Sequence, residues 1–432
     1  MPSDRLAAAL ARRNIHYGWV VAATTFLTML VTAGAVGAPG AFILPLQREF
    51  GWQTSDISSA LAVRLLLFGL MGPFAAALIN RYGLRRIATI ALSLIAGGLL
   101  LSLGMTHVWQ LIVLWGFVLG FGTGMTALVL GATVATRWFT ARRGLVVGLL
   151  TASSATGQLV FLPLITSLNE HVGWRISILV ITGAIAFAVL IITALMRDRP
   201  SDVGLPPYGE TTVAAAAPPS AAALSPLAAL REAARTRMFW ILFATFFICG
   251  ASTNGLIQTH FIPLCVDFGL PAVGAASVLA MMGVFDFVGT IGSGWLSDRY
   301  DNRYLLAWYY GLRGFSLMAL PFTDFSFYGL SLFAMFYGLD WIATVPPTVK
   351  LTAANFGRER TNLVFGWVFA GHQIGAASAA FLAGLSRTTL VTYLPAFFIS
   401  GALCVIAAAL ALVIVRPGST ATVAPTLAPA KA

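Results

Sequence analysis

The 432-residue chain is 58% hydrophobic and only 9% charged, with a mean hydropathy of +0.86. Water-soluble domains carry about 25% charged residues, so this composition excludes an ordinary soluble protein. The net charge of +11 raises the question of a nucleic-acid partner. The positions of the basic residues along the chain decide that question.

Apolar runs of about 20 residues recur along the chain, and each is long enough to cross a hydrocarbon core of ~30 Å as an α-helix. The short alternating segments of a membrane β-barrel do not occur in the sequence. The pattern predicts an all-α membrane protein. Its twelve transmembrane helices are expected to begin near Tyr17, Ser55, Ile87, Val108, Leu145, Trp174, Met238, Val273, Tyr304, Phe325, Thr361 and Thr389.

The basic residues are distributed unequally between the two sides of these spans. With both termini placed in the cytoplasm, Arg48, Arg175 and Arg387 are the basic residues on the opposite side, and Arg64 and Arg313 lie within spans. All other Lys and Arg residues fall in cytoplasmic loops and tails. This asymmetry follows the positive-inside rule. It predicts a multi-pass protein of the inner membrane with both termini cytoplasmic, and it explains the net charge without a nucleic-acid partner.

The sequence has no pattern that indicates catalysis or metal binding. The cysteines Cys249, Cys265 and Cys404 lie in or at the ends of apolar spans without paired spacing, so we expect packing residues and not disulfides or a zinc site. No HExxH, nucleophile elbow or nucleotide-binding loop occurs in the sequence. We therefore predict a protein that is not an enzyme and has no cofactor and no metal.

An internal repeat relates the two halves of the chain. FILPLQREFG at 42–51 aligns with HFIPLCVDFG at 260–269 at a constant shift of 218 residues, which matches Pro45 with Pro263. The shift spans an even number of helices, so the two copies run parallel, related by an axis along the membrane normal. The repeat predicts two six-helix halves.

The predicted organisation is an N-terminal half at 1–196, a cytoplasmic linker at 197–236, a C-terminal half at 237–415 and a disordered tail at 416–432. The stretch 200–225 is rich in Ala, Pro and Thr, which is typical of a mobile linker. Leu227 to Arg237 is expected to form a short surface helix.

The loop after the second helix of each half resembles the GxLxDRxGRR motif of the major facilitator superfamily. The second copy carries Gly294, Leu296, Asp298, Arg299 and Arg303, and the first carries Leu78, Arg81, Gly83, Arg85 and Arg86, with Asn80 in place of the acid. The resemblance covers nearly the whole chain and implies a secondary transporter whose halves rock about a central site. It also implies a cytoplasmic gate that latches the halves, formed by Asp298, Arg299 and Arg303 and by the degenerate Asn80, Arg81 and Gly83.

Three patches are similar to the monocarboxylate porter and oxalate/formate exchanger branch of that superfamily: YGWVV at 17–21, RRGLVVGLLTASSATGQ at 142–158 and RPSDVGLPPYG at 199–209. That branch carries a basic residue in its eighth or eleventh helix for the substrate carboxylate. Here Asp286 is followed after four residues by Thr290, and the eleventh span has His372 and no lysine. The chain therefore departs from the branch at its usual carboxylate anchor.

Four ionisable residues fall near the middle of predicted spans, namely Arg64, Asp286, Arg313 and Asp340. Each would cost roughly 2.5–3.5 kcal/mol if it faced lipid, so we expect them to face each other or water. The repeat register places Arg64 one helical turn from the equivalent of Asp286, which suggests that both approach one central cavity.

Two interpretations of these charges remain open. Arg64 suits an anionic substrate, because its planar guanidinium donates two parallel hydrogen bonds and keeps its charge. Asp286 and Asp340 are candidates for proton coupling. Alternatively, the two acids and two bases neutralise one another inside the bundle, an interpretation that we favour for Arg313 with Asp340.

Further polar candidates for substrate binding are His372, Gln373, Asn254, Gln258 and His260. For the two histidines, a simple packing role is the alternative. The favoured substrate is a small organic anion such as a monocarboxylate, moved by proton symport or by exchange through a monomer embedded in the lipid bilayer. Efflux of amphipathic drug-like compounds is the alternative, and a non-transporting membrane sensor is the rival from another class.

Overall fold

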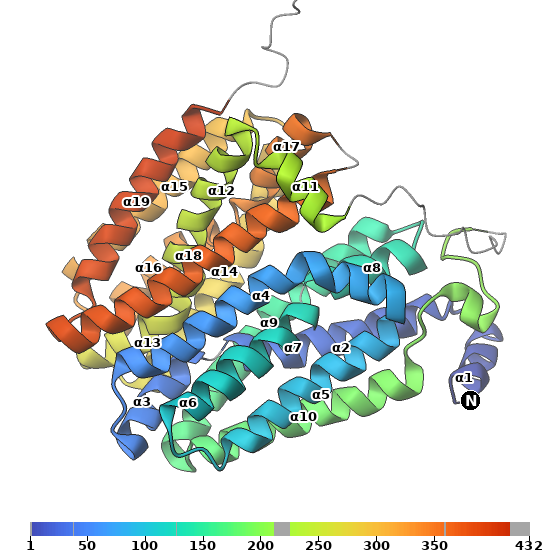
Figure 1. Ribbon diagram of the computed structural model, residues 1–432, viewed down its shortest axis with the longest axis horizontal. Helices are drawn as coiled ribbons and strands as arrows, with labels where there is room; N and C mark the ends of the chain where they lie inside the picture. The colour runs from blue at the N-terminus through green and yellow to red at the C-terminus, as the bar shows by residue number, and fades with distance from the viewer. Residues whose placement is uncertain (1, 38, 127, 211–224, 358–359, 415–432) are drawn as a thin grey trace, which may run out of the picture.

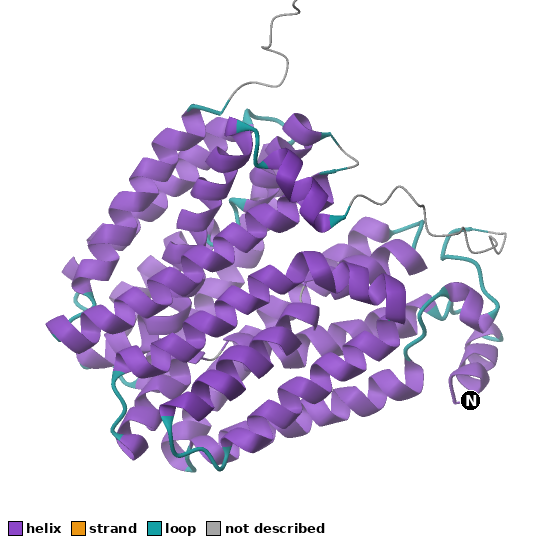
Figure 2. Ribbon diagram, viewed as in Figure 1, coloured by secondary structure: helices purple, strands orange, loops and turns teal. Residues whose placement is uncertain are grey.

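The computed structural model describes residues 2–37, 39–126, 128–210, 225–357 and 360–414. Helices joined by short loops make up these residues, and no strand occurs among them (Figure 2). The helices pack into two bundles that lie against each other (Figure 1). The predicted all-α fold is confirmed.

Each bundle contains six membrane-spanning segments, several of them built from consecutive helices. The first bundle contains α2 (Gly18–Gly37) with α3 (Pro39–Phe50), α4 (Thr54–Tyr82), α5 (Leu84–Ser102), α6 (Val108–Leu111) with the π-helix η1 (Ile112–Val118), α7 (Leu119–Thr126) and α8 (Leu128–Trp138), α9 (Arg143–His171), and α10 (Trp174–Leu195). The second contains α12 (Arg237–Gly250) with the π-helix η3 (Ala251–Ile257) and α13 (Gln258–Asp267), α14 (Ala272–Ser297), α15 (Asn302–Ala319) with η4 (Leu320–Phe322), α16 (Phe327–Asp340) with α17 (Val345–Phe356), α18 (Thr361–Leu390), and α19 (Leu394–Leu412).

Length and composition support these spans. Nine helical segments of the described ranges are long and apolar enough to cross a membrane. The α2–α3 pair, α9 and α15 complete the twelve. Odd-numbered spans start at the face that carries the central linker, here called the linker face, and end at the opposite face, here called the far face.

The repeat is visible in the packing as well as in the sequence. A Cβ added at Gly120 would lie 3.2 Å from the backbone of Arg64, and one added at Gly338 would lie 3.0 Å from the Cα of Met282. Each residue of the second pair lies 218 positions after its counterpart in the first pair, which is the shift of the internal repeat. The same helix crossing therefore occurs in each half, where a glycine lets two spans approach closely.

The first part of the linker is packed and does not follow the prediction of a mobile stretch. The Tyr208 N–H donates to the carbonyl of Trp138 at 2.8 Å, and the Tyr208 carbonyl accepts the N–H of Ala141 at 2.9 Å. The ring of Tyr208 also lies 5.8 Å from that of Trp19. These contacts hold the linker against the first half at Tyr208, which has both backbone and aromatic partners there.

Other predictions for the linker and tail have mixed outcomes. The expected surface helix is α11 (Pro226–Ala233), which ends before α12 begins at Arg237. Residues 211–224 and the predicted disordered tail at 416–432 lie outside the described residues.

The two halves meet along three helix pairs, α4 with α18, α9 with α14, and α3 with α13. At the far face, the Ser55 N–H donates to Oγ1 of Thr388 at 3.1 Å. A Cβ added at Gly40 would lie 2.5 Å from the carbonyl oxygen of Thr259. Close backbone approach therefore joins the halves at this face.

Candidate functional site

The tenth span is interrupted near its middle, between α16 and α17. The helix ends at Asp340 and restarts at Val345, and the next two residues are Pro346 and Pro347. Proline has no N–H and its ring clashes with the carbonyl four residues earlier, so regular helix cannot continue through 341–344. Backbone groups freed at this depth must find partners inside the protein.

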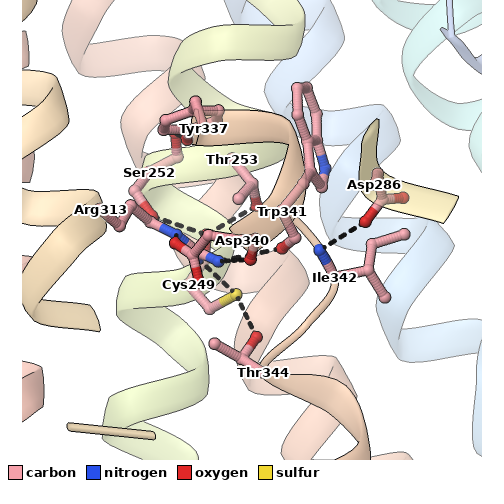
Figure 3. A network of polar contacts seen from close by, with 10 residues as sticks. All are labelled: Cys249, Ser252, Thr253, Asp286, Arg313, Tyr337, Asp340, Trp341, Ile342 and Thr344. Atoms are coloured by element: carbon pink, nitrogen blue, oxygen red, sulfur yellow. Dashed lines mark hydrogen bonds and ion pairs between the residues drawn. The ribbon is translucent and has the colours of Figure 1, made fainter. Parts of the chain in front are cut away.

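Arg313 of α15 supplies the donors for the end of α16 (Figure 3). Its Nη2 donates to the carbonyls of Asp340 at 2.6 Å and Trp341 at 3.0 Å. Its Nε donates to Oδ2 of Asp340 at 2.8 Å, and the guanidinium is fully buried. A cation is favourable here because the carboxyl end of a helix carries partial negative charge.

Asp286 of α14 binds the same interruption from another side. Its Oδ1 accepts the N–H of Ile342 at 2.8 Å and the hydroxyl of Thr290 at 3.1 Å. Ser293, two turns along α14, donates its hydroxyl to the carbonyl of Ala343 at 2.5 Å. Side chains from two helices thus satisfy the backbone of 340–343.

Cys249 of α12 also belongs to this cluster, although we expected only a packing residue there. Nη1 of Arg313 lies 3.0 Å from its Sγ, and Oγ1 of Thr344 lies 3.3 Å from the same sulfur. Cys249, Cys265 and Cys404 are free thiols, as predicted. No signal of this contact was visible in the sequence, because Cys249 lies on the seventh span and Arg313 on the ninth.

Arg64 lies in α4 with 3% of its surface exposed. The structure does not bring it to Asp286, whose carboxylate binds Ile342 and Thr290. The two residues occupy related positions in different halves. Arg64 instead lies where α4 crosses α7 beside Gly120.

The polar candidates of the eleventh span face two different neighbours. The ring of His372 packs against Phe246 and Phe369, at centroid distances of 4.9 and 5.6 Å. Gln373 packs against Gly69 of α4. Among the described residues, Nδ1 of His372 and Oε1 of Gln373 have no hydrogen-bond partner. Gln373 therefore lies at the contact between the halves, and His372 lies inside the second half.

The candidates of the seventh span lie in or next to the π-helix η3. Asn254 is half-buried, and its carbonyl accepts the hydroxyl of Thr259 at 2.8 Å. The expected shared face of Asn254 and Gln258 assumed α-helical spacing, whereas the i→i+5 bonds of η3 widen the turn. His260 is fully buried, and its Nε2 lies 2.8 Å from the carbonyl oxygen of Ala380.

The predicted gate residues of the second half contact elements of that same half. Asp298 forms an ion pair with Lys350 of α17, and the hydrogen bond from Lys350 lowers the pKa of the exposed Asp298. The Arg299 guanidinium lies 3.9 Å from the ring centroid of Trp295. Arg303 pairs with Asp301 at 2.7 Å.

The first half has the corresponding arrangement. Asn80 accepts a hydrogen bond from Nη2 of Arg137 at 2.6 Å, and the Arg81 guanidinium lies 5.3 Å from the centroid of the Tyr82 ring. Gly83 has a φ of 91° and leaves room for the Asp198 carboxylate, which accepts the Arg85 N–H at 2.8 Å. These contacts stabilise the linker-face loops within each half.

A cavity of about 330 Å³ lies at the far face between the halves. The first half contributes Gln47, Trp52 and Thr54, and the second half contributes Arg387 and Tyr393. Nε of Arg387 donates to Asp267 at 2.8 Å at its edge. None of the candidates for substrate binding lines this cavity.

Comparisons with known proteins agree with this architecture. A family model described as the Major Facilitator Superfamily matches residues 24–345. The uncharacterized MFS-type transporter YcxA of Bacillus subtilis (strain 168) is 23% identical over 392 residues, covering 87% of this chain and 89% of that protein. Monocarboxylate transporter 7 of Homo sapiens is 26% identical, covering 93% and 86%. The solved structure of nucleoside transporter NupG has a similar fold, with a TM-score of 0.73 at 10% identity, covering 93% of this chain and 99% of that one.

Proposed function

The chain belongs to the major facilitator superfamily, and we propose that it is a secondary transporter that moves a small organic anion by alternating access. Membership in a family of transporters distinguishes it from enzymes. Several similar proteins are monocarboxylate transporters by name, which favours a monocarboxylate as the substrate. We further propose that the linker face is cytoplasmic, because most basic residues lie there.

The observation that carries the anion proposal is the burial of Arg64 in α4, the helix that contacts α18 of the other half. A guanidinium buried in a helix that contacts the other half suits a carboxylate, which it binds through two parallel hydrogen bonds. Binding there would be sensed by both halves. We propose Asp286 as the group that takes up the coupling proton, since its carboxylate holds the interruption of the tenth span.

Counterflow of a radiolabelled monocarboxylate panel in proteoliposomes tests the anion site. We expect Arg64→Ala to abolish uptake and Arg64→Lys to retain part of it, because lysine keeps the charge but loses the planar fork. Arg48→Ala is the matched control, since Arg48 is an exposed arginine of α3. Uptake by Arg64→Ala at the wild-type rate would contradict the assignment, as would drug flux without any anion flux.

A second measurement tests the proton. We expect Asp286→Asn to lose accumulation driven by a pH gradient while it retains exchange of labelled for unlabelled solute, because exchange needs no net proton movement. Undiminished accumulation by this variant would exclude Asp286 as the coupling group.

A further inference from the structure

The guanidinium of Arg313 lies in a set of acceptors that resembles a cation site. Its partners are the carboxylate and carbonyl of Asp340, the carbonyl of Trp341 and the sulfur of Cys249. Four of its five N–H donors are used by these contacts. In transporters with discontinuous helices, such unwound carbonyls and helix ends coordinate the coupling cation.

The twelve-span architecture does not itself require an ion pair at this place. Subtracting the repeat shift of 218 from 313 and 340 gives Ile95 and Gly122 in the first half. These two residues are also in contact, because a Cβ at Gly122 would lie 2.6 Å from Cγ1 of Ile95. The same crossing is therefore apolar in one half and ionic in the other.

The interruption accounts for this difference between the halves. The residues of the first half that correspond to 341–344 are 123–126, which lie within α7, and no proline follows at 128 or 129. There, the Thr123 hydroxyl bonds the carbonyl of Leu119 within the helix. Prolines, freed carbonyls and buried charges thus occur together, in the second half.

We infer that the Arg313 guanidinium is a tethered cation that fills a site built by the interrupted tenth span. Its removal leaves a vacancy for a free monovalent cation of matching shape. Guanidinium ion fits best, because it has the same planar donors as the lost side chain. A metal cation is not needed at this place in the wild-type protein, since Arg313 already neutralises Asp340.

Chemical rescue of Arg313→Ala tests the inference. We expect the purified variant to unfold at a lower temperature than the wild type, and millimolar guanidinium chloride to raise that temperature saturably. Urea, which is planar but neutral, and choline chloride, which is charged but lacks N–H donors, should have no such effect, and the wild type should not respond to any of the three. Equal responses to guanidinium and urea would overturn the inference, as would a variant as stable as the wild type.

A second variant keeps the test decisive if Arg313→Ala does not survive purification. Arg313→Ile with Asp340→Gly copies the contact of the first half and removes both charges of the pair, so it should be purified folded but show no guanidinium response. Arg313→Lys keeps the charge and should remain stable without added guanidinium. A double variant that guanidinium still stabilises, or an Arg313→Lys variant that unfolds like Arg313→Ala, would contradict a tethered cation. These stability measurements need no substrate, so they stand apart from the proposed transport of an organic anion.

Discussion

A close contact between the two halves that one added methyl group can test lies at Gly69 of α4. A Cβ at this position would overlap the Cβ of Gln373 in α18 and lie 2.8 Å from its Cγ. Gly72, on the next turn of the same helix, has no described atom within 4 Å of such a Cβ. The two glycines therefore form a matched pair that differs in packing.

The expected size of the effect follows from two opposing contributions. Replacing glycine by alanine inside a helix stabilises the fold by roughly 0.5–1 kcal/mol, because the unfolded chain loses conformational freedom. Overpacking a close contact costs about 1–3 kcal/mol. We expect Gly72→Ala to be stabilised by about 0.5–1 kcal/mol and Gly69→Ala to be destabilised by roughly 1 kcal/mol.

Thermal unfolding in detergent micelles, followed by tryptophan fluorescence, measures this difference. The order of unfolding temperatures should be Gly72→Ala above wild type and wild type above Gly69→Ala. Gly69→Ala should also slow counterflow, because it alters the surface between the halves. If Gly69→Ala unfolds at or above the temperature of Gly72→Ala, the helices are not in close contact at this point and the reasoning is refuted.

Two further predictions concern the interruption and the linker face. Ser293→Ala leaves the carbonyl of Ala343 without its donor and should cost about 1–3 kcal/mol of unfolding free energy; Ser293→Thr keeps a hydroxyl and should cost less, and equal stabilities of both variants would contradict the assignment. The ion pair with Lys350 lowers the pKa of Asp298, so its contribution is present above the ordinary carboxyl pKa of about 3.9 and is lost as the pH falls through the lowered value. Carboxyl NMR should place the Asp298 midpoint below ~3.9 in the wild type and nearer to it in Lys350→Gln, and a midpoint that Lys350→Gln leaves unmoved would exclude the pair in solution.

Hydropathy and the repeat predicted the architecture, because a membrane span needs about 20 apolar residues wherever it lies in the bundle. The partners of the buried charged residues could not all be predicted from their positions along the chain. Arg313 and Asp340 lie on the ninth and tenth spans, and the sequence already favoured their pairing. Arg64 and Asp286 were predicted to approach one cavity, and they do not contact each other, because equivalence under the repeat places two residues alike in different halves without bringing them together.

The sequence contains a signal for the interruption of the tenth span, the adjacent Pro346 and Pro347. Counting the spans by hydropathy did not use this signal. Two of the residues around the interruption, Ser293 and Cys249, had no such signal, because they are small residues whose contacts depend on how the helices cross. The gate motif was recognisable at Asp298, but its partner Lys350 became identifiable once α14 and α17 were placed side by side. A helix break or a motif can thus be recognised in the sequence. The residues that pair across helices can be identified only once the packing of the helices is known.

Asp286 and Arg64, the two buried residues proposed to take part in transport, differ in their contacts with the backbone. Asp286 accepts a backbone N–H at the interruption, so adding a proton to the bonded oxygen weakens the tie between α14 and the tenth span. Arg64 lies beside α7, a helix without such an interruption at 119–126. A solute carboxylate that binds Arg64 would act on α4, the helix that contacts α18 of the other half, whereas a proton on Asp286 would act on the tenth span within one half. Proton binding and anion binding would then change different parts of the same cycle, and the coupling between them must pass through the α4–α18, α9–α14 and α3–α13 contacts that join the halves.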